Sequence, residues 1–138
     1  MRRALLLAAL TFLVAQAIPV KRDNPPAEGE ISAPPAVQAL LKRSCYDCHS
    51  NQTRWPWYAR VAPVSWLVAH DVHEGREHLN FSTWGRYSAD ERREHVEEIR
   101  ENVEEGEMPL WFYLPLHPEA KLTAADVERI ARWTRHGR

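Results

Sequence analysis

The chain has 138 residues, a length typical of one small domain. Its 18 basic and 19 acidic residues nearly balance, and 44% of all residues are hydrophobic. These values exclude the clustered basic surface on which nucleic-acid-binding proteins depend, so no nucleic acid partner is expected.

Residues 1–17 have the features of an export signal. Met1-Arg2-Arg3 is basic, an apolar run follows, and Ala15-Gln16-Ala17 has the alternating small residues that a signal peptidase accepts. Left uncleaved, residues 4–20 would instead form a short membrane anchor. Both interpretations place the domain outside the cytoplasm. The proline-rich residues 18–35 are predicted to be a linker.

Residues 36–138 are predicted to form one small all-α domain. Four segments have apolar residues at the helical period, and no run of alternating β-branched residues competes with them. Proline precedes the first two segments, capping residues begin the third and fourth, and glycine follows the third. These signals are Pro35, Pro63, Ser88 with Glu91, Thr123 with Asp126, and Gly106.

The stretch SCYDCHS holds the only two cysteines of the chain, Cys45 and Cys48, with His49 directly after them. A structural zinc site needs four ligands. This stretch offers Cys45, Cys48 and His49 only, and the chain has no second cysteine pair to complete the site. A thioredoxin-like redox pair would need a strand and a βαβ context, which the sequence lacks. A disulfide is compatible with an oxidising compartment, although so short a loop gains little entropic stabilisation.

Covalent haem explains more of this stretch than the other chemistries. Cys-x-x-Cys-His is the attachment motif of c-type haem, in which both thiols bond to porphyrin vinyl groups and the histidine reaches the iron from the same face. We therefore predict one covalently attached haem c on Cys45 and Cys48, with His49 as an iron ligand. The other ring nitrogen of His49 is expected to donate to a backbone carbonyl, near Pro56 or Pro63.

Met108 is the predicted second iron ligand and the only methionine besides the initiator. Pro109 follows it and denies the loop a helical conformation, which suits a side chain held pointing inward. The alternative is that Met108 only fills a gap in the core. His117 is the reserve ligand. Four other histidines are expected to face water or to lie at the rim of a helix face, at about 100° per residue: His70, His73, His78 and His95.

On these residues the chain resembles the class I c-type cytochromes and, more narrowly, a family of small bacterial haem-binding domains. The matching segments lie between about residues 30 and 134: CYDCHSN at Cys45, TRWPWY at Thr53, APVSWL at Ala62, HLNFS at His78, GEMP at Gly106 and HP at His117. The resemblance implies a cytochrome c-like fold of about four helices around one covalent haem, with Met108 as a ligand. Members often keep the N-terminal helix as an anchor.

Arg54 and Trp57, which follow the motif in the chain, are further candidates for contact with the cofactor. Arg54 is placed to donate to a haem propionate, although a solvated arginine is an equal alternative. Trp57 is predicted to pack against the porphyrin, and most of the six tryptophans are expected in the core.

With both axial positions of the iron taken, the sequence predicts one-electron transfer. The protein would be a periplasmic monohaem cytochrome and not an enzyme, exported and either free or anchored to the inner membrane. It would meet its redox partner proteins transiently, after the cytochrome c maturation machinery has attached the haem. One rival is a peroxidase, or a gas or redox sensor, in which Met108 is displaced. The other is a haem-free interaction module with a Cys45–Cys48 disulfide.

Overall fold

The computed structural model of the protein describes residues 1–136, and within these residues all regular structure is helical. The α-helices are α1 (Arg2–Gln16), α2 (Pro35–Ser44), α3 (Tyr46–His49), α4 (Val64–His78), α5 (Ala89–Glu105) and α6 (Ala124–His136). Short 3-10 helices are η1 (Trp57–Arg60), η2 (Phe81–Arg86) and η3 (Pro118–Ala120). The predicted all-α fold is confirmed; residues 137 and 138 of the predicted domain lie outside the described residues.

The four predicted helices are α2, α4, α5 and α6, and their ends follow the local signals. At the start of α5, the Ser88 hydroxyl accepts from the Glu91 N–H at 3.3 Å, and the Glu91 carboxylate accepts from the Ser88 N–H at 2.7 Å. Gly106 ends the helix with φ at 75°, a left-handed conformation that glycine adopts without strain. Thr123 and Asp126 cap α6 in the same reciprocal way.

Ser88→Ala is expected to lower the free energy of unfolding by about 1 kcal/mol, because one N–H of the first turn of α5 loses its acceptor. Urea denaturation followed by circular dichroism measures this change. Ser32→Ala is the control: Ser32 is exposed and outside any helix, so its loss should change stability by less than about 0.5 kcal/mol. Equal effects of the two substitutions would contradict the capping role.

The core lies where α2, α5, α6 and η2 meet. Leu41, Phe81 and Ile130 are its most completely buried large apolar residues. Tyr46, between the two cysteines, turns into this core and stacks on Phe81 with 5.3 Å between ring centroids. The short helix α3 lies against α4 and carries the cysteine motif from the core to the surface. The motif is therefore attached to the core through Tyr46.

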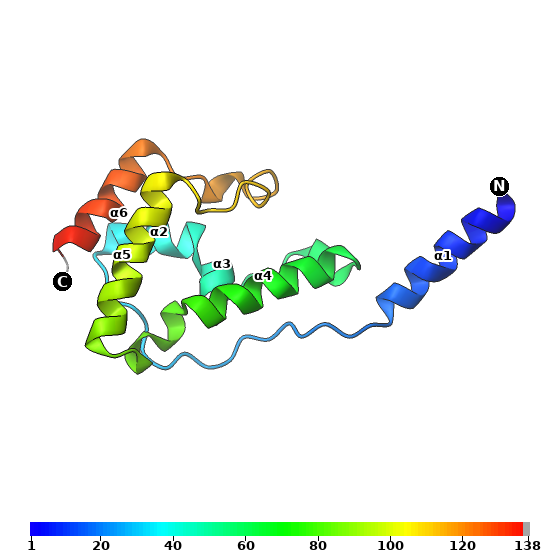
Figure 1. The fold of residues 1–138 in the computed structure, drawn as a ribbon, viewed down its shortest axis with the longest axis horizontal. Helices are drawn as coiled ribbons and strands as arrows, with labels where there is room; N and C mark the ends of the chain where they lie inside the picture. Colours follow the sequence, from blue (N-terminus) through cyan, green and yellow to red (C-terminus); the bar gives the residue numbers. More distant parts are fainter. Residues whose placement is uncertain (137–138) are drawn as a thin grey trace.

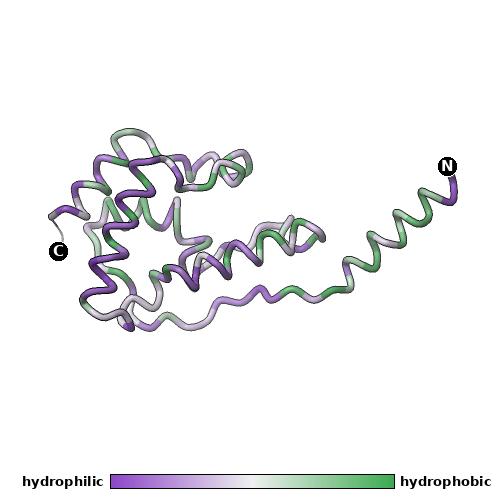
Figure 2. Tube along the Cα trace, in the orientation of Figure 1, coloured by the Kyte–Doolittle hydropathy of each residue, from purple (hydrophilic) through white to green (hydrophobic). Residues whose placement is uncertain are grey.

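Helix α1 projects away from the rest of the protein (Figure 1) and is apolar along most of its length (Figure 2). Its leucines and Phe12 are exposed. Gln16 at its end exchanges two hydrogen bonds with the backbone of Ala62. Across residues 1–136, no helix combines the length and the apolar character that crossing a bilayer requires.

The predicted linker differs from a free spacer, because it runs beside α4 with its first half and along η2 to α2 with its second half (Figure 1). Asn24 donates to the Thr53 carbonyl at 2.9 Å, and the Ile31 N–H donates to the Phe81 carbonyl at 3.0 Å. The Ile31 side chain is buried in the core. The proline-rich composition was misleading because backbone groups of the segment find free partners on η2, which the sequence does not reveal.

Candidate functional site

A cleft lies between α3, α4 and the loop that follows α5. Its central cavity, of about 390 Å³, is lined by the four residues predicted to hold the cofactor: Cys45, Cys48, His49 and Met108. Cavities of about 170 and 130 Å³ continue from it toward α5 and toward η1, and each shares lining residues with it. The combined cleft is in the size range of cofactor sites, roughly 300–1,000 Å³.

The thiols of Cys45 and Cys48 are free and partly buried at the cleft. Burial raises the pKa of each thiol to about 12, so both stay protonated at neutral pH. Thiol–disulfide exchange proceeds through the thiolate. The site therefore does not favour a thiol redox pair.

The His49 ring is held by the C-terminal end of α4. Its Nδ1 lies 3.0 Å from the Gly75 carbonyl oxygen and 3.2 Å from that of Leu79. The expectation of an acceptor near Pro56 or Pro63 was wrong, because the last carbonyls of a helix are open to side-chain donors and α4 ends directly against α3. Sequence spacing alone does not show which helix end reaches the ring.

These contacts also define the protonation of His49. Carbonyl oxygens only accept, so Nδ1 carries the proton and donates. Burial lowers the pKa of the ring, which keeps it neutral. Its Nε2 therefore presents a lone pair and makes no hydrogen bond to the described residues. A neutral imidazole oriented through its other nitrogen is the usual form of a histidine metal ligand.

Gly75 is a functional residue that the sequence reasoning did not assign. A Cβ at this position would lie 2.8 Å from the Cys48 carbonyl oxygen and 3.2 Å from the Cys48 Cβ. Only glycine lets α4 approach α3 closely enough for the Gly75 carbonyl to accept from His49. The available signal was a glycine inside a helix, where it costs about 1 kcal/mol relative to alanine and so indicates a packing reason.

Met108 lies just beyond α5, 59 residues after His49 in the chain, and lines both the central cavity and the cavity toward α5. Its N–H donates to the Asn102 carbonyl at 3.2 Å, which attaches the loop to the last turn of α5. The side chain is half-buried. His49 and Met108 thus border the same two cavities.

The structure shows which of the other histidines are already paired and which are exposed, a distinction that the sequence made only in part. Both ring nitrogens of His117 are engaged, Nε2 with the Tyr58 hydroxyl at 2.5 Å and Nδ1 with Glu119 at 3.4 Å. His70 and His73 are exposed, as expected from their helix face. His78 lines the central cavity, but its side chain is 63% exposed and pairs with Glu98 at 3.5 Å.

Arg54 and Trp57 lie outside the central cavity. The Arg54 guanidinium pairs with the Asp47 carboxylate at 3.0 Å and borders only the cavity toward η1. Trp57 is 77% exposed and borders none of the three cavities. Contact of either residue with a cofactor stays a prediction.

The expectation that most tryptophans lie in the core was wrong. Trp57, Trp66 and Trp111 are exposed, and the other three are only half-buried. Trp57 and Trp111 lie in η1 and in the loop after α5, and Trp66 lies on an outer face of α4, whereas the core forms between α2, α5 and α6.

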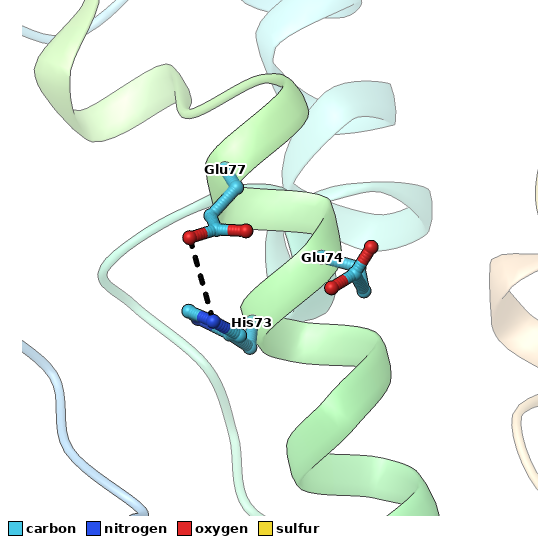
Figure 3. Close-up of side chains that lie close together, drawn as sticks. All are labelled: His73, Glu74 and Glu77. Carbon is cyan, nitrogen blue, oxygen red and sulfur yellow. Dashed lines mark ion pairs between the residues drawn. The ribbon is translucent and has the colours of Figure 1, made fainter.

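A separate group of possible metal ligands lies on α4. The ligand atoms of His73, Glu74 and Glu77 lie within 4.8 Å of one another, and His73 pairs with Glu77 at 3.4 Å (Figure 3). All three residues are exposed, as in an ordinary surface pair one helical turn apart. In the described part of the chain no such group includes a cysteine, so a zinc site at Cys45 and Cys48 gains no further ligand.

Comparison with known families gives a match over residues 10–136 to a family described as a haem-binding domain. The chain belongs to this haem-binding domain family. The match begins within α1 and so includes the linker, further toward the N-terminus than the segments named above. Comparisons with curated proteins and with solved structures found no match.

The cleft of this haem-binding protein fits a haem in shape and in chemistry. Apolar side chains line both of its ends, Ile99 and Val103 from α5 and Val64 and Leu67 from α4. Two thiols and an imidazole with one free nitrogen lie between these ends, together with a thioether from Met108. These are the groups with which proteins hold haem and its iron.

Proposed function

We propose that the protein is a monohaem c-type cytochrome that transfers single electrons in the periplasm. The observation that supports this most is the meeting of Cys45, Cys48, His49 and Met108 in one cleft of a haem-binding domain. Cys45 and Cys48 would hold the porphyrin covalently, and His49 and Met108 would be the axial ligands.

Attachment requires no oxidant. Each thiol would add across one vinyl group, with the sulfur bonding to one vinyl carbon and the thiol proton going to the other. The thiols must be reduced when they react, which is the task of a cytochrome c maturation system. The mass of the chain then rises by that of one whole haem.

When bound, the haem supplies one reversible one-electron couple. The protein's own residues would set its properties. His49 Nδ1, held by two carbonyl oxygens, makes the imidazole a better donor through Nε2. The Met108 thioether is a soft ligand that favours the ferrous state and raises the potential relative to two histidines. With both axial positions filled, electron transfer is favoured over substrate chemistry.

Partners and location follow from the same proposal. Residues 1–17 would be removed on export, or α1 would remain as an attachment to the inner membrane. Redox partner proteins would meet the domain through a small, transient contact. The exposed Phe112, which lines the central cavity, and the neighbouring exposed Trp111 are suited to such a contact, because aromatic residues are enriched at protein interfaces.

Met108→Ala in protein matured with covalent haem tests the ligand assignment. We expect the haem to stay attached, the iron to become high-spin or water-ligated, and the deep-red sulfur-to-ferric-iron absorption band to disappear. Optical spectra of the oxidised protein measure this. Leu110→Ala is the matched control, because Leu110 lines the same cavity and has no atom that could bind iron. The Leu110→Ala protein should keep the deep-red band.

The alternatives give different results in the same spectra. A Met108→Ala variant with an unchanged spectrum would contradict ligation by Met108. A wild-type protein without the band, whose spectrum changes in His78→Ala, would indicate a second histidine ligand. Turnover of peroxide by the native protein would favour the rival in which Met108 is displaced.

A further inference from the structure

The loop from Pro109 to His117 has few attachments to the rest of the protein. Its backbone hydrogen bonds join residues of the loop to one another or to the adjoining Ala120. Trp111 is 80% exposed and Phe112 42%, so apolar burial does not hold its tip. Met108 lies at the base of this loop. Besides the bond of the Met108 N–H to Asn102, whatever secures the loop therefore helps to secure the Met108 side chain at the cleft.

One attachment goes directly to the cysteine motif. The Tyr113 hydroxyl donates to Asp47 Oδ2 at 2.8 Å, and Asp47 lies between Cys45 and Cys48. Both residues line the central cavity. The Asp47 side chain is only 12% exposed, so this hydrogen bond to a carboxylate is partly shielded from water. Shielded bonds to a charged group are stronger than neutral ones.

Asp47 is itself held in place from the other side. Its Oδ1 accepts from the Arg54 N–H at 2.9 Å and from Arg54 Nε at 3.2 Å, and its backbone carbonyl accepts from the Thr53 hydroxyl at 2.8 Å. The carboxylate is therefore presented to Tyr113 in a fixed orientation. This pairing also explains why Arg54 is not directed into the central cavity.

The second attachment lies beside the first. His117 Nδ1 faces the Glu119 carboxylate and donates to it, which leaves Nε2 to accept from the Tyr58 hydroxyl at 2.5 Å. The His117 ring stacks on Tyr113 with 4.0 Å between centroids and 7° between planes. Among the described residues, two hydrogen bonds join residues 109–117 to α3 and η1. They are the bond from Tyr113 to Asp47 and the bond from Tyr58 to His117.

We infer that Asp47 and Tyr113 form a clasp that closes the Met108 loop over the haem cleft and keeps the thioether at the iron. This inference rests on the proposed His49 and Met108 ligation. Asp47 is then a positioning residue inside the haem motif, with a role separate from the attachment chemistry of its neighbours. Tyr58 and His117 support the clasp from η1.

Displacement of Met108 by imidazole measures how firmly the loop is closed. In the ferric holoprotein, imidazole replaces the thioether and abolishes the deep-red band. Tyr113→Phe removes only the donating hydroxyl, and we expect half-displacement at about tenfold lower imidazole, the effect of losing a hydrogen bond to a charged group. Tyr87→Phe is the matched control, because the Tyr87 hydroxyl accepts from the Asn80 N–H at 2.9 Å, away from the loop.

A double-mutant cycle separates a shared bond from general damage. Asp47→Ala should lower the imidazole midpoint as Tyr113→Phe does, and the double variant should add little to either, because both remove the same interaction. Additive effects, or a Tyr113→Phe midpoint equal to that of the wild type while its band is present, would overturn the clasp and leave the proposed function standing.

Failure of the proposed function gives a different result. A wild-type holoprotein without the deep-red band would contradict Met108 ligation before any clasp variant is made. Amide hydrogen exchange then tests the clasp by itself. Faster exchange at Tyr113, Leu116 and His117 in Tyr113→Phe, with no change in Tyr87→Phe, supports the clasp; equal exchange in both variants overturns it.

Discussion

Gly75→Ala is expected to lower the free energy of unfolding of the haem-loaded protein by about 2 kcal/mol. The new methyl would lie 2.8 Å from the Cys48 carbonyl oxygen, a backbone atom that cannot move without moving the haem motif. Relief of the clash separates α4 from α3 and lengthens the contact of the Gly75 carbonyl with His49 Nδ1. We therefore also expect a smaller fraction of chains to carry haem.

The sign of this change is informative, because glycine to alanine inside a helix otherwise stabilises by about 1 kcal/mol. Guanidinium denaturation and the ratio of haem to protein absorbance measure the two effects. Gly106→Ala is the control: apart from its chain neighbours, no atom lies within 4 Å of the position that its Cβ would take, and only its left-handed φ of 75° opposes the substitution. It should leave haem loading unchanged. A more stable Gly75→Ala protein would show that α3 and α4 are far enough apart to accept the added methyl without a clash.

Cys45→Ser with Cys48→Ser is expected to abolish covalent haem completely. Serine has nearly the shape of cysteine, but its hydroxyl does not add to a vinyl group under maturation conditions. Each single substitution should keep one thioether, and the double variant none. Acidified organic solvent then extracts all haem from the double variant and none from the wild type, and intact mass gives the number of attached haems.

Ser44→Ala is the matched control for this pair. Ser44 directly precedes Cys45 and lines the same cavities, and its buried hydroxyl makes no hydrogen bond to any described residue. Its loss should leave one covalent haem in place. Wild-type protein that matures without colour, or with Cys45 and Cys48 joined to each other, would contradict the c-type assignment.

Much of the candidate site was predictable because its chemistry is encoded locally. Two thiols and an imidazole within five residues predict covalent haem attachment without reference to the rest of the chain. Met108 stood out because the initiator is the only other methionine. The ends of α5 and α6 were equally local, since a capping box joins residues only three positions apart.

The contacts that organise the site were not predictable in this way. The carbonyls that orient His49, the partner of Arg54 and the attachment of residues 109–117 all depend on which segments meet in space. Each joins residues that are far apart in sequence or follow no periodic pattern. The burial of Ile31 and the exposure of the tryptophans were missed for the same reason, because composition does not tell which surfaces remain open after the helices assemble.

By itself, the sequence determined that the protein is helical, that it carries a Cys-x-x-Cys-His motif and which sulfur and nitrogen atoms that motif and Met108 offer. Only the tertiary structure decided that α4 meets α3 at Gly75 and that Tyr113 reaches Asp47. The physical reason is range: helix periodicity, caps and motif spacing act within a few residues, whereas ring orientation and loop closure arise from surfaces that come together only when the chain is folded.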